Sequence, residues 1–155
     1  MIRTMSSIKA SILTLSLVLV MCNVPLAATD SYSLKLDEFD GTNWEDAMAR
    51  LDNLAITLSN EPGSIGVLIV YGGRRGRRGE AQAWGKCLRD YMVNSRGVSA
   101  NRVVLVDGGF RDAITAEIWK SAGKQYIPTP APTVDPKDVR FRKGKIKGWR
   151  SLCNI

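Results

Sequence analysis

The sequence contains no histidine and few of the other residue patterns that carry out chemistry. Histidine is the most frequent general base and metal ligand near neutral pH, so its absence removes the usual partner of a serine or cysteine nucleophile. The acidic residues are scattered without metal-site spacing, and the glycines match neither a phosphate-binding loop nor a dinucleotide-binding motif. We therefore expect a protein that is not an enzyme, with no catalytic residue, no metal and no cofactor.

Residues 1–28 have the pattern of a secretory signal peptide. Arg3 and Lys9 precede an apolar run at residues 10–21, and small residues follow that run. The run is shorter than the roughly 20 apolar residues that a membrane-spanning helix needs. We expect export to the periplasm or the medium after cleavage near Ala28. A buried N-terminal helix is the alternative.

Cysteine is also scarce. Cys22 lies near the end of the predicted leader. A lipid attached to Cys22 would make a membrane a partner of the protein. Met21 argues against this alternative, because lipid-attachment signals usually have a small residue before the cysteine. Cys87 and Cys153 would remain in a compartment where thiols oxidise, and a disulfide between them would contribute about 4 kcal/mol in the chain-entropy model. A buried Cys87 with a free thiol in the tail is the alternative.

The hydrophobic pattern of residues 29–123 predicts one domain. Alternating or continuously apolar runs indicate strands, and apolar residues at i, i+3, i+4 and i+7 indicate helices. The expected order is strand, helix, strand, helix, strand, strand (βαβαββ). This order gives an α/β, or α+β, two-layer sandwich in which a mixed sheet packs against two helices. Strands are expected at residues 29–40, 65–71, 102–106 and 114–119, with helices from Thr42 to Pro62 and from Gly79 to Gly97.

Local signals refine this outline. Thr42 and Glu45 have the spacing of a capping box at the start of the first helix. Residues 107–109, Asp-Gly-Gly, indicate a turn, and the alternation that follows them indicates an antiparallel strand at an edge of the sheet. The apolar strands at 65–71 and 102–106 are expected to be covered on both faces. Core positions on them are Val67, Ile69, Val104 and Leu105.

Residues 124–155 differ in composition from the predicted domain. Residues 124–139 hold four prolines, which indicates an extended or flexible segment outside the core. Residues 139–150 are rich in lysine and arginine and contain no acidic residue. The chain as a whole has a formal net charge of +7 at pH 7, which favours anionic partners.

Residues 72–79, GGRRGRRG, combine four arginines with four glycines. Strands joined by a helical crossover run parallel, so we expect this loop to lie beside the end of the strand at 102–106. Four cations at a helix start oppose the helix dipole, so helix stability does not explain them. The expected anion-binding residues are Arg74, Arg75, Arg77, Arg78, Asp107 and Arg111. The alternative is a solvated connecting loop.

The segment at 65–118 resembles the OmpA-like peptidoglycan-binding domain. Residues 87–109, CLRDYMVNSRGVSANRVVLVDGG, are similar to the family's passage from helix to strand. The matching positions are Tyr91-Met92, Gly97, Arg102 and Gly108-Gly109. The resemblance implies a sandwich of this kind and a site for the diaminopimelate carboxylates and amine of the peptidoglycan stem. The family holds that ligand through an aspartate after the first strand and an arginine early in the next helix.

The ligand-binding pair of the family is not matched here. Gly72-Gly73 follow the first strand, and Trp84 stands at the arginine position. The loop arginines would then take over recognition of a carboxylate or phosphate.

Two functions follow from these observations. The first is an exported, non-catalytic cell-envelope protein that binds peptidoglycan or another anionic wall component through the arginine-rich loop. The second is a structural or accessory envelope protein with no ligand at that site. Nucleic acid is disfavoured as a partner, because the chain is expected to be exported and no aromatic run for base stacking adjoins the loop. If the loop binds nothing, the basic tail from Arg140 to Arg150 is the next candidate.

Overall fold

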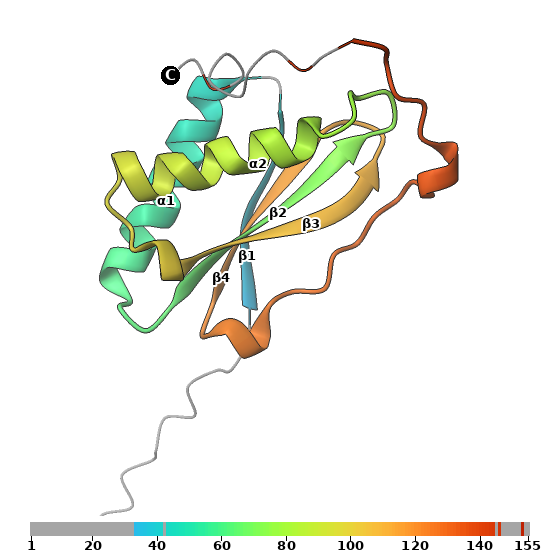
Figure 1. The fold of residues 1–155 in the computed structure, drawn as a ribbon. Coiled ribbons are helices and arrows are strands. Elements are labelled where there is room, and N and C mark those ends of the chain that lie inside the picture. The colour runs from blue at the N-terminus through green and yellow to red at the C-terminus, as the bar shows by residue number, and fades with distance from the viewer. Residues whose placement is uncertain (1–32, 42, 145, 147–152, 154–155) are drawn as a thin grey trace, which may run out of the picture.

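The computed structural model describes residues 33–41, 43–144, 146 and 153. In this part of the chain a four-stranded mixed sheet carries two α-helices on one face (Figure 1), which confirms the predicted α+β sandwich. The strands are β1 (Ser33–Asp40), β2 (Ile65–Gly73), β3 (Val103–Arg111) and β4 (Thr115–Ser121), and the helices are α1 (Trp44–Asn60) and α2 (Glu80–Asp90). The sheet order is β1-β4-β2-β3. Strands β2 and β3 are parallel, as expected, and the other neighbouring pairs are antiparallel.

Helix α1 begins after Asn43, which acts as its N-cap. The Asn43 side-chain oxygen accepts hydrogen bonds from the backbone N–H groups of Glu45 and Asp46, at 2.9 and 3.3 Å. The predicted capping box of Thr42 and Glu45 is therefore wrong, because asparagine is an equally good cap one position later. Thr42 itself lies outside the described residues.

The two helices bury one apolar stripe each against the sheet. On α1 the stripe includes Leu51, Leu54 and Leu58, and on the second helical segment it is the predicted set Trp84, Cys87, Leu88, Tyr91 and Met92. The helical backbone of α2 continues through a π-helical turn, Tyr91–Ser95, before Gly97 takes a positive φ of 68°. These stripes pack on Leu68 and Val70 of β2 and on Ala116 and Ile118 of β4.

Strand β2 is buried along its whole length. Leu68 and Val70 face the helices, whereas Val67, Ile69 and Tyr71 face the opposite side of the sheet. The prediction that this strand is covered on both faces is confirmed. It is the central element of the fold, because β3 and β4 pair with its two edges.

The positions of β3 and β4 differ from the prediction. Strand β3 is at the edge of the sheet, with Val104 partly buried and Leu105 37% exposed, so neither residue is fully buried in the core. Strand β4, predicted at an edge, lies between β1 and β2. The alternation of apolar and polar residues at 114–119 led to the wrong prediction because Glu117 is polar but buried. A buried carboxylate with hydrogen-bond partners gives the same sequence pattern as a solvated one.

Residues 107–109 continue β3 and form a bulge, so the prediction of a turn is wrong. Two steps along β2 from Val70 match three steps along β3 from Asp107, which places one extra residue in β3. Gly109 has φ of +80° and donates its N–H to the Asp107 carboxylate at 2.9 Å. The chain turns only after Arg111.

The segment after β4 is extended but belongs to the packed domain. Val134 and Val139 are buried, and the N–H groups of Thr133 and Val134 donate to the carbonyl of Phe110 at 3.0 and 3.1 Å. The expectation that residues 124–139 lie outside the core is therefore wrong. Figure 1 shows this segment passing along the β3 side of the sheet.

A disulfide joins α2 to the end of the chain. Cys87 and Cys153 are bonded, with Cα atoms 5.9 Å apart and 66 positions between them in the sequence, which confirms the predicted pairing. A loop of this length corresponds to about 4 kcal/mol of stabilisation in the chain-entropy model. Within the described ranges, no helix is long and apolar enough to cross a membrane.

The edge position of β3 leads to a stability prediction. Leu105→Ala should lower the free energy of unfolding by less than about 2 kcal/mol, because its side chain already meets solvent. Leu68→Ala, the matched change in fully buried β2, should cost about 2–5 kcal/mol. Urea unfolding of both variants measures the difference. An equal or larger loss for Leu105→Ala would contradict the edge assignment.

Candidate functional site

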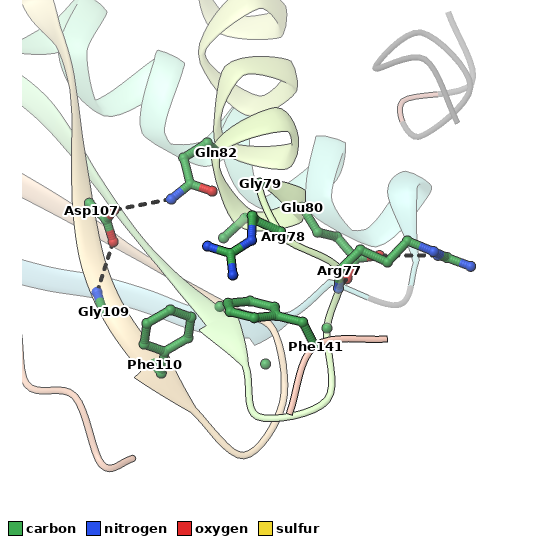
Figure 2. Close-up of a pocket in the computed structure, with 13 residues that line it drawn as sticks. Arg77, Arg78, Gly79, Glu80, Gln82, Asp107, Gly109, Phe110 and Phe141 are labelled. Atoms are coloured by element: carbon green, nitrogen blue, oxygen red, sulfur yellow. Dashed lines mark hydrogen bonds and ion pairs between the residues drawn. The ribbon is translucent and has the colours of Figure 1, made fainter. Parts of the chain in front are cut away.

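A pocket of about 160 Å³ opens where β2 and β3 end (Figure 2). Its walls come from the arginine-rich loop, the first turn of α2, the end of β3 and the basic tail. The side chains that matter most below are Arg77, Arg78, Gln82, Asp107, Phe110 and Phe141. We call this the rim pocket. It forms at this place because the carboxyl ends of parallel strands meet at one edge of a sheet.

The backbone of the loop is hydrogen-bonded on two sides. Arg74 donates its N–H to the carbonyl of Arg111 at 2.8 Å, which joins the loop to the end of β3. From the tail, Arg140 donates to the Arg74 carbonyl at 2.8 Å and Arg142 donates to the Gly76 carbonyl at 3.0 Å. The basic tail and the arginine-rich loop, predicted as separate features, are therefore parts of one surface.

Glu80 folds back over the loop. Its carboxylate accepts a hydrogen bond from the backbone N–H of Arg77 at 2.8 Å, and the Arg77 guanidinium lies 3.5 Å from its other oxygen. The Arg77 side chain points away from the rim pocket (Figure 2). Although Arg77 contributes to the lining, much of its charge is balanced within the loop.

Arg78 differs from Arg77 in direction and in partners. Its side chain lies between Gln82 and the two phenylalanines of the rim pocket (Figure 2). The guanidinium carbon is 4.7 Å from the ring centroid of Phe141, which in turn contacts Phe110 edge to face at 6.0 Å. Among the described residues Arg78 makes no ion pair. Stacking fixes a guanidinium plane while leaving its N–H groups free for a carboxylate or phosphate.

Asp107 supplies the opposite charge in the rim pocket. One carboxylate oxygen accepts from the Gln82 side-chain amide at 3.1 Å, and the other accepts from the N–H of Gly109 at 2.9 Å. Both donors are neutral, and no cation of the described residues pairs with this carboxylate. The rim pocket can therefore bind a group that carries an anion for Arg78 and an N–H donor for Asp107.

The start of α2 adds backbone donors to the same wall. Its N-cap is Gly79, with φ of +80° and no capping side chain, so the first-turn N–H groups have no side-chain partner there. Such groups favour a negative charge in front of the helix. They reinforce the preference that Arg78 gives to the rim pocket.

The structure separates the predicted site residues into those that line the rim pocket, those elsewhere in the loop, and Arg111. The first group is Arg77, Arg78 and Asp107. Arg74 and Arg75 belong to the loop but do not line it, since the Arg74 guanidinium lies 3.0 Å from the Asp112 carboxylate and Arg75 is exposed without a partner among the described residues.

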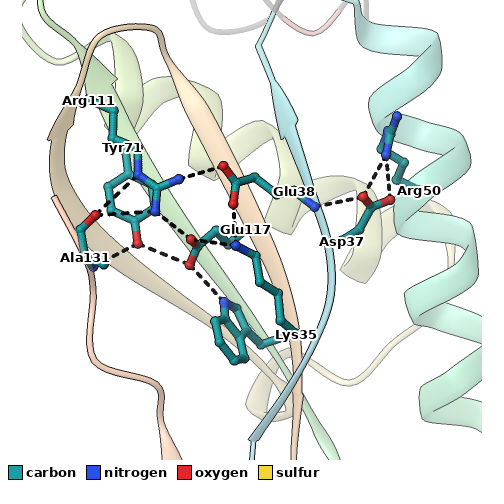
Figure 3. A network of polar contacts seen from close by, with 9 residues as sticks. Lys35, Asp37, Glu38, Arg50, Tyr71, Arg111, Glu117 and Ala131 are labelled. Carbon is teal, nitrogen blue, oxygen red and sulfur yellow. Dashed lines mark hydrogen bonds and ion pairs between the residues drawn. The ribbon is translucent and has the colours of Figure 1, made fainter. Parts of the chain in front are cut away.

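Arg111 faces the other side of the sheet, so its predicted place in the site is wrong. Neighbouring residues of a strand point to opposite faces, and Phe110 takes the side of the rim pocket. The Arg111 guanidinium is 2.6 Å from Glu117, 2.8 Å from Glu38 and 3.6 Å from the ring centroid of Tyr71 (Figure 3).

Glu117 is the centre of this second cluster. Its side chain is 5% exposed and accepts one hydrogen bond from each strand of the sheet. The donors are Lys35 of β1, Tyr71 of β2, Arg111 of β3 and Trp119 of β4, at 3.0, 3.1, 2.6 and 3.0 Å. Burial opposes ionisation, but the bonds from Lys35, Trp119 and Arg111 outweigh it and hold the pKa of Glu117 below its ordinary value.

Sequence reasoning missed both Glu117 and Phe141. The signal for Glu117 was a single acidic residue between apolar neighbours in a strand, beside a tryptophan that can donate a hydrogen bond. Phe141 gave no comparable signal, because its contact with the loop depends on the path of the whole C-terminal segment.

Comparison with known proteins adds no assignment. No protein-family model matches the chain, and no curated protein matches it. In the described part of the molecule, no three cysteine or acidic side chains are grouped to hold a metal ion. Function is therefore inferred from the rim pocket and from the group of polar contacts around Glu117.

The buried carboxylate leads to a prediction about stability and pH. Glu117→Gln should lower the free energy of unfolding at pH 7 by about 3 kcal/mol or more, because it leaves Arg111 and Lys35 without their buried counter-charge. The pKa of Glu117 is lower in the folded protein than its ordinary 4.5, so its stabilising contribution is complete above that value and is lost as the pH falls. The gap between wild type and variant should narrow below about pH 4.5.

Glu38→Gln is the matched control, because Glu38 contacts the same two cations but its side chain is 42% exposed. It should cost less than about 1 kcal/mol. Chemical unfolding from pH 3 to pH 8 measures both variants. Equal losses for the two, or a gap that widens in acid, would contradict the role given to Glu117.

Proposed function

We propose that this chain is an exported, non-catalytic cell-envelope protein that binds peptidoglycan, or another anionic wall component, at the rim pocket. The observation that carries the proposal is the placement of Arg78. Its guanidinium is stacked on Phe141 inside a concave site and makes no ion pair with a described residue. An arginine held over an aromatic ring in this way suits bidentate capture of a carboxylate or phosphate.

The charges around Arg78 favour a wall peptide over a simple anion. Asp107 lies in the same pocket and accepts only neutral hydrogen bonds from the described residues. A bare phosphate would be repelled by that carboxylate, whereas a peptide offers both a carboxylate and N–H donors. The stem peptide of peptidoglycan has this combination of groups.

An OmpA-like relationship is part of the proposal. The unit β2-α2-β3, with its loop after the first strand, supports it. The family's ligand positions are occupied differently here. Trp84 is buried with its ring centroid 5.7 Å from that of Phe39, and a Cβ atom at Gly73 would be crowded by the backbone nitrogen of Ile114 at 3.1 Å. We infer that recognition has moved along the loop to Arg78.

Export and the lack of catalysis are proposed on separate grounds. The charged and apolar leader supports export, and the Cys87–Cys153 disulfide is typical of an oxidising compartment. The rim pocket offers Asp107 and Glu80 as its carboxylates. Glu80 is bonded to Arg77, and Asp107 has no histidine partner for acid–base chemistry, because the sequence contains none. A binding module fits these groups better than an enzyme.

A structural envelope protein without a ligand is the second candidate. One observation favours it: two of the loop arginines are neutralised within the protein, Arg74 by Asp112 and Arg77 by Glu80. Arg78 is the exception, because it lines the rim pocket and makes no ion pair with a described residue. A purely structural loop gives no reason for that difference.

Arg78→Gln and its control Arg75→Gln test the proposal. Both changes remove one exposed arginine from the same loop, but Arg75 does not line the rim pocket. Protein expressed from the full sequence should be retained by purified peptidoglycan sacculi. Arg78→Gln should weaken retention about tenfold or more, as expected for loss of a charged hydrogen bond, and Arg75→Gln should leave it nearly unchanged.

Equal retention of the two variants would show that net charge, rather than the rim pocket, holds the protein to the wall. No retention of the wild-type protein would favour the structural role. Thermal unfolding of both variants checks that the fold is kept.

A further inference from the structure

An apolar groove of about 220 Å³ adjoins the rim pocket. It lies between α2 and the edge strand β3, and it is lined by Val70, Ala81, Gln82, Leu105, Val106 and Asp107. Ala81, Gln82 and Asp107 also line the rim pocket, so the two cavities are adjacent and share these residues. The hydrogen-bonded pair of Gln82 and Asp107 stands at their border.

The groove is bounded by an unpaired strand edge. Among the described residues, β3 has β2 as its neighbouring strand, and its outer side meets one isolated bridge, from Phe110 to Val134. The first part of β3, residues 103–106, is apolar, and Leu105 is 37% exposed there. An open strand edge beside a groove is a site where an extended peptide can add as a further strand.

We propose that the rim pocket and the groove together bind the free carboxyl terminus of a wall peptide whose last residue is aliphatic. The terminal carboxylate pairs with Arg78, the last peptide N–H donates to Asp107, and the last side chain enters the groove beside Leu105. The peptide runs parallel to β3, because β3 leads toward the rim pocket. This inference rests on the proposed function and specifies which part of the wall polymer is recognised.

Size and polarity select a peptide end over a lipid chain. The groove is smaller than the roughly 300–1,000 Å³ of sites for drug-sized ligands, so it suits one side chain. A lipid chain crossing the border would cover the Gln82 and Asp107 polar groups without offering hydrogen bonds, which is unfavourable. A peptide bond offers a donor and an acceptor at that point.

The wall of the groove is held in place by close packing. A Cβ atom at Gly85 would come within 2.8 Å of a Leu105 methyl and 3.2 Å of a Val70 methyl. Helix α2 therefore rests directly on these two residues, and the glycine permits the approach. A groove of fixed width discriminates between side chains by size, as hydrophobic pockets do.

Calorimetric titration with five synthetic tetrapeptides tests the inference. Two end in L- or D-valine with a free carboxylate, two are the C-terminal amides of these, and the fifth ends in glycine with a free carboxylate. The amide and the glycine peptide should each bind about tenfold more weakly than the free valine peptide in its better configuration. Equal affinity of the valine and glycine peptides, or of acid and amide, would overturn the inference.

Two variants locate the effect. Leu105→Ser should remove most of the preference for valine over glycine and leave the preference for acid over amide. Ile56→Ser, which changes an aliphatic side chain 60% exposed on α1, should alter neither. A valine preference that survives in Leu105→Ser would also overturn the inference.

The two proposals fail in different ways. If sacculus retention depends on Arg78 but the peptides show no preference, wall binding stands and the carboxyl-terminal mode is wrong. If retention does not depend on Arg78, the proposed function falls as well.

Discussion

The buried carboxylate of Glu117 is the constraint on which the rest of the structure depends. Each of the four strands donates one hydrogen bond to it, so the far face of the sheet is joined through a single side chain. Arg111 and Lys35 compensate its charge, and Tyr71 uses its hydroxyl twice, as a donor to Glu117 and as an acceptor from the N–H of Ala131 at 3.1 Å. The C-terminal segment is thereby attached to the same cluster.

This cluster also decides what reaches the rim pocket. Because Arg111 is held on the far face, Phe110 turns toward α2, where a Cβ atom at Gly72 would lie 3.0 Å from its ring. Phe110 supports Phe141, and Phe141 supports Arg78. A chain of contacts therefore leads from the buried carboxylate to the one pocket arginine that is free of ion pairs within the described ranges.

Much of the fold could be read from the sequence, because helices, buried strands and the parallel pair leave local patterns. The order of the strands could not be predicted, because an apolar run such as the one around Leu105 is compatible with an edge strand and with a central strand of the sheet. The sequence Asp107-Gly108-Gly109 suits a turn and a bulge equally well, because either structure can use the positive φ that Gly109 adopts. The position of the loop beside the end of β3 could be predicted, but the placement of Arg78 over Phe141 could not, because Phe141 is distant in sequence.

The central claim, that recognition is local to the rim pocket, is tested most directly by nuclear magnetic resonance. Soluble peptidoglycan fragments are titrated into isotopically labelled protein, and backbone amide shifts are followed. The account predicts shifts concentrated at residues 76–82, at residues 105–110 and at Phe141. Shifts confined to the basic residues beyond Phe141, or no shifts at saturating fragment, would contradict it.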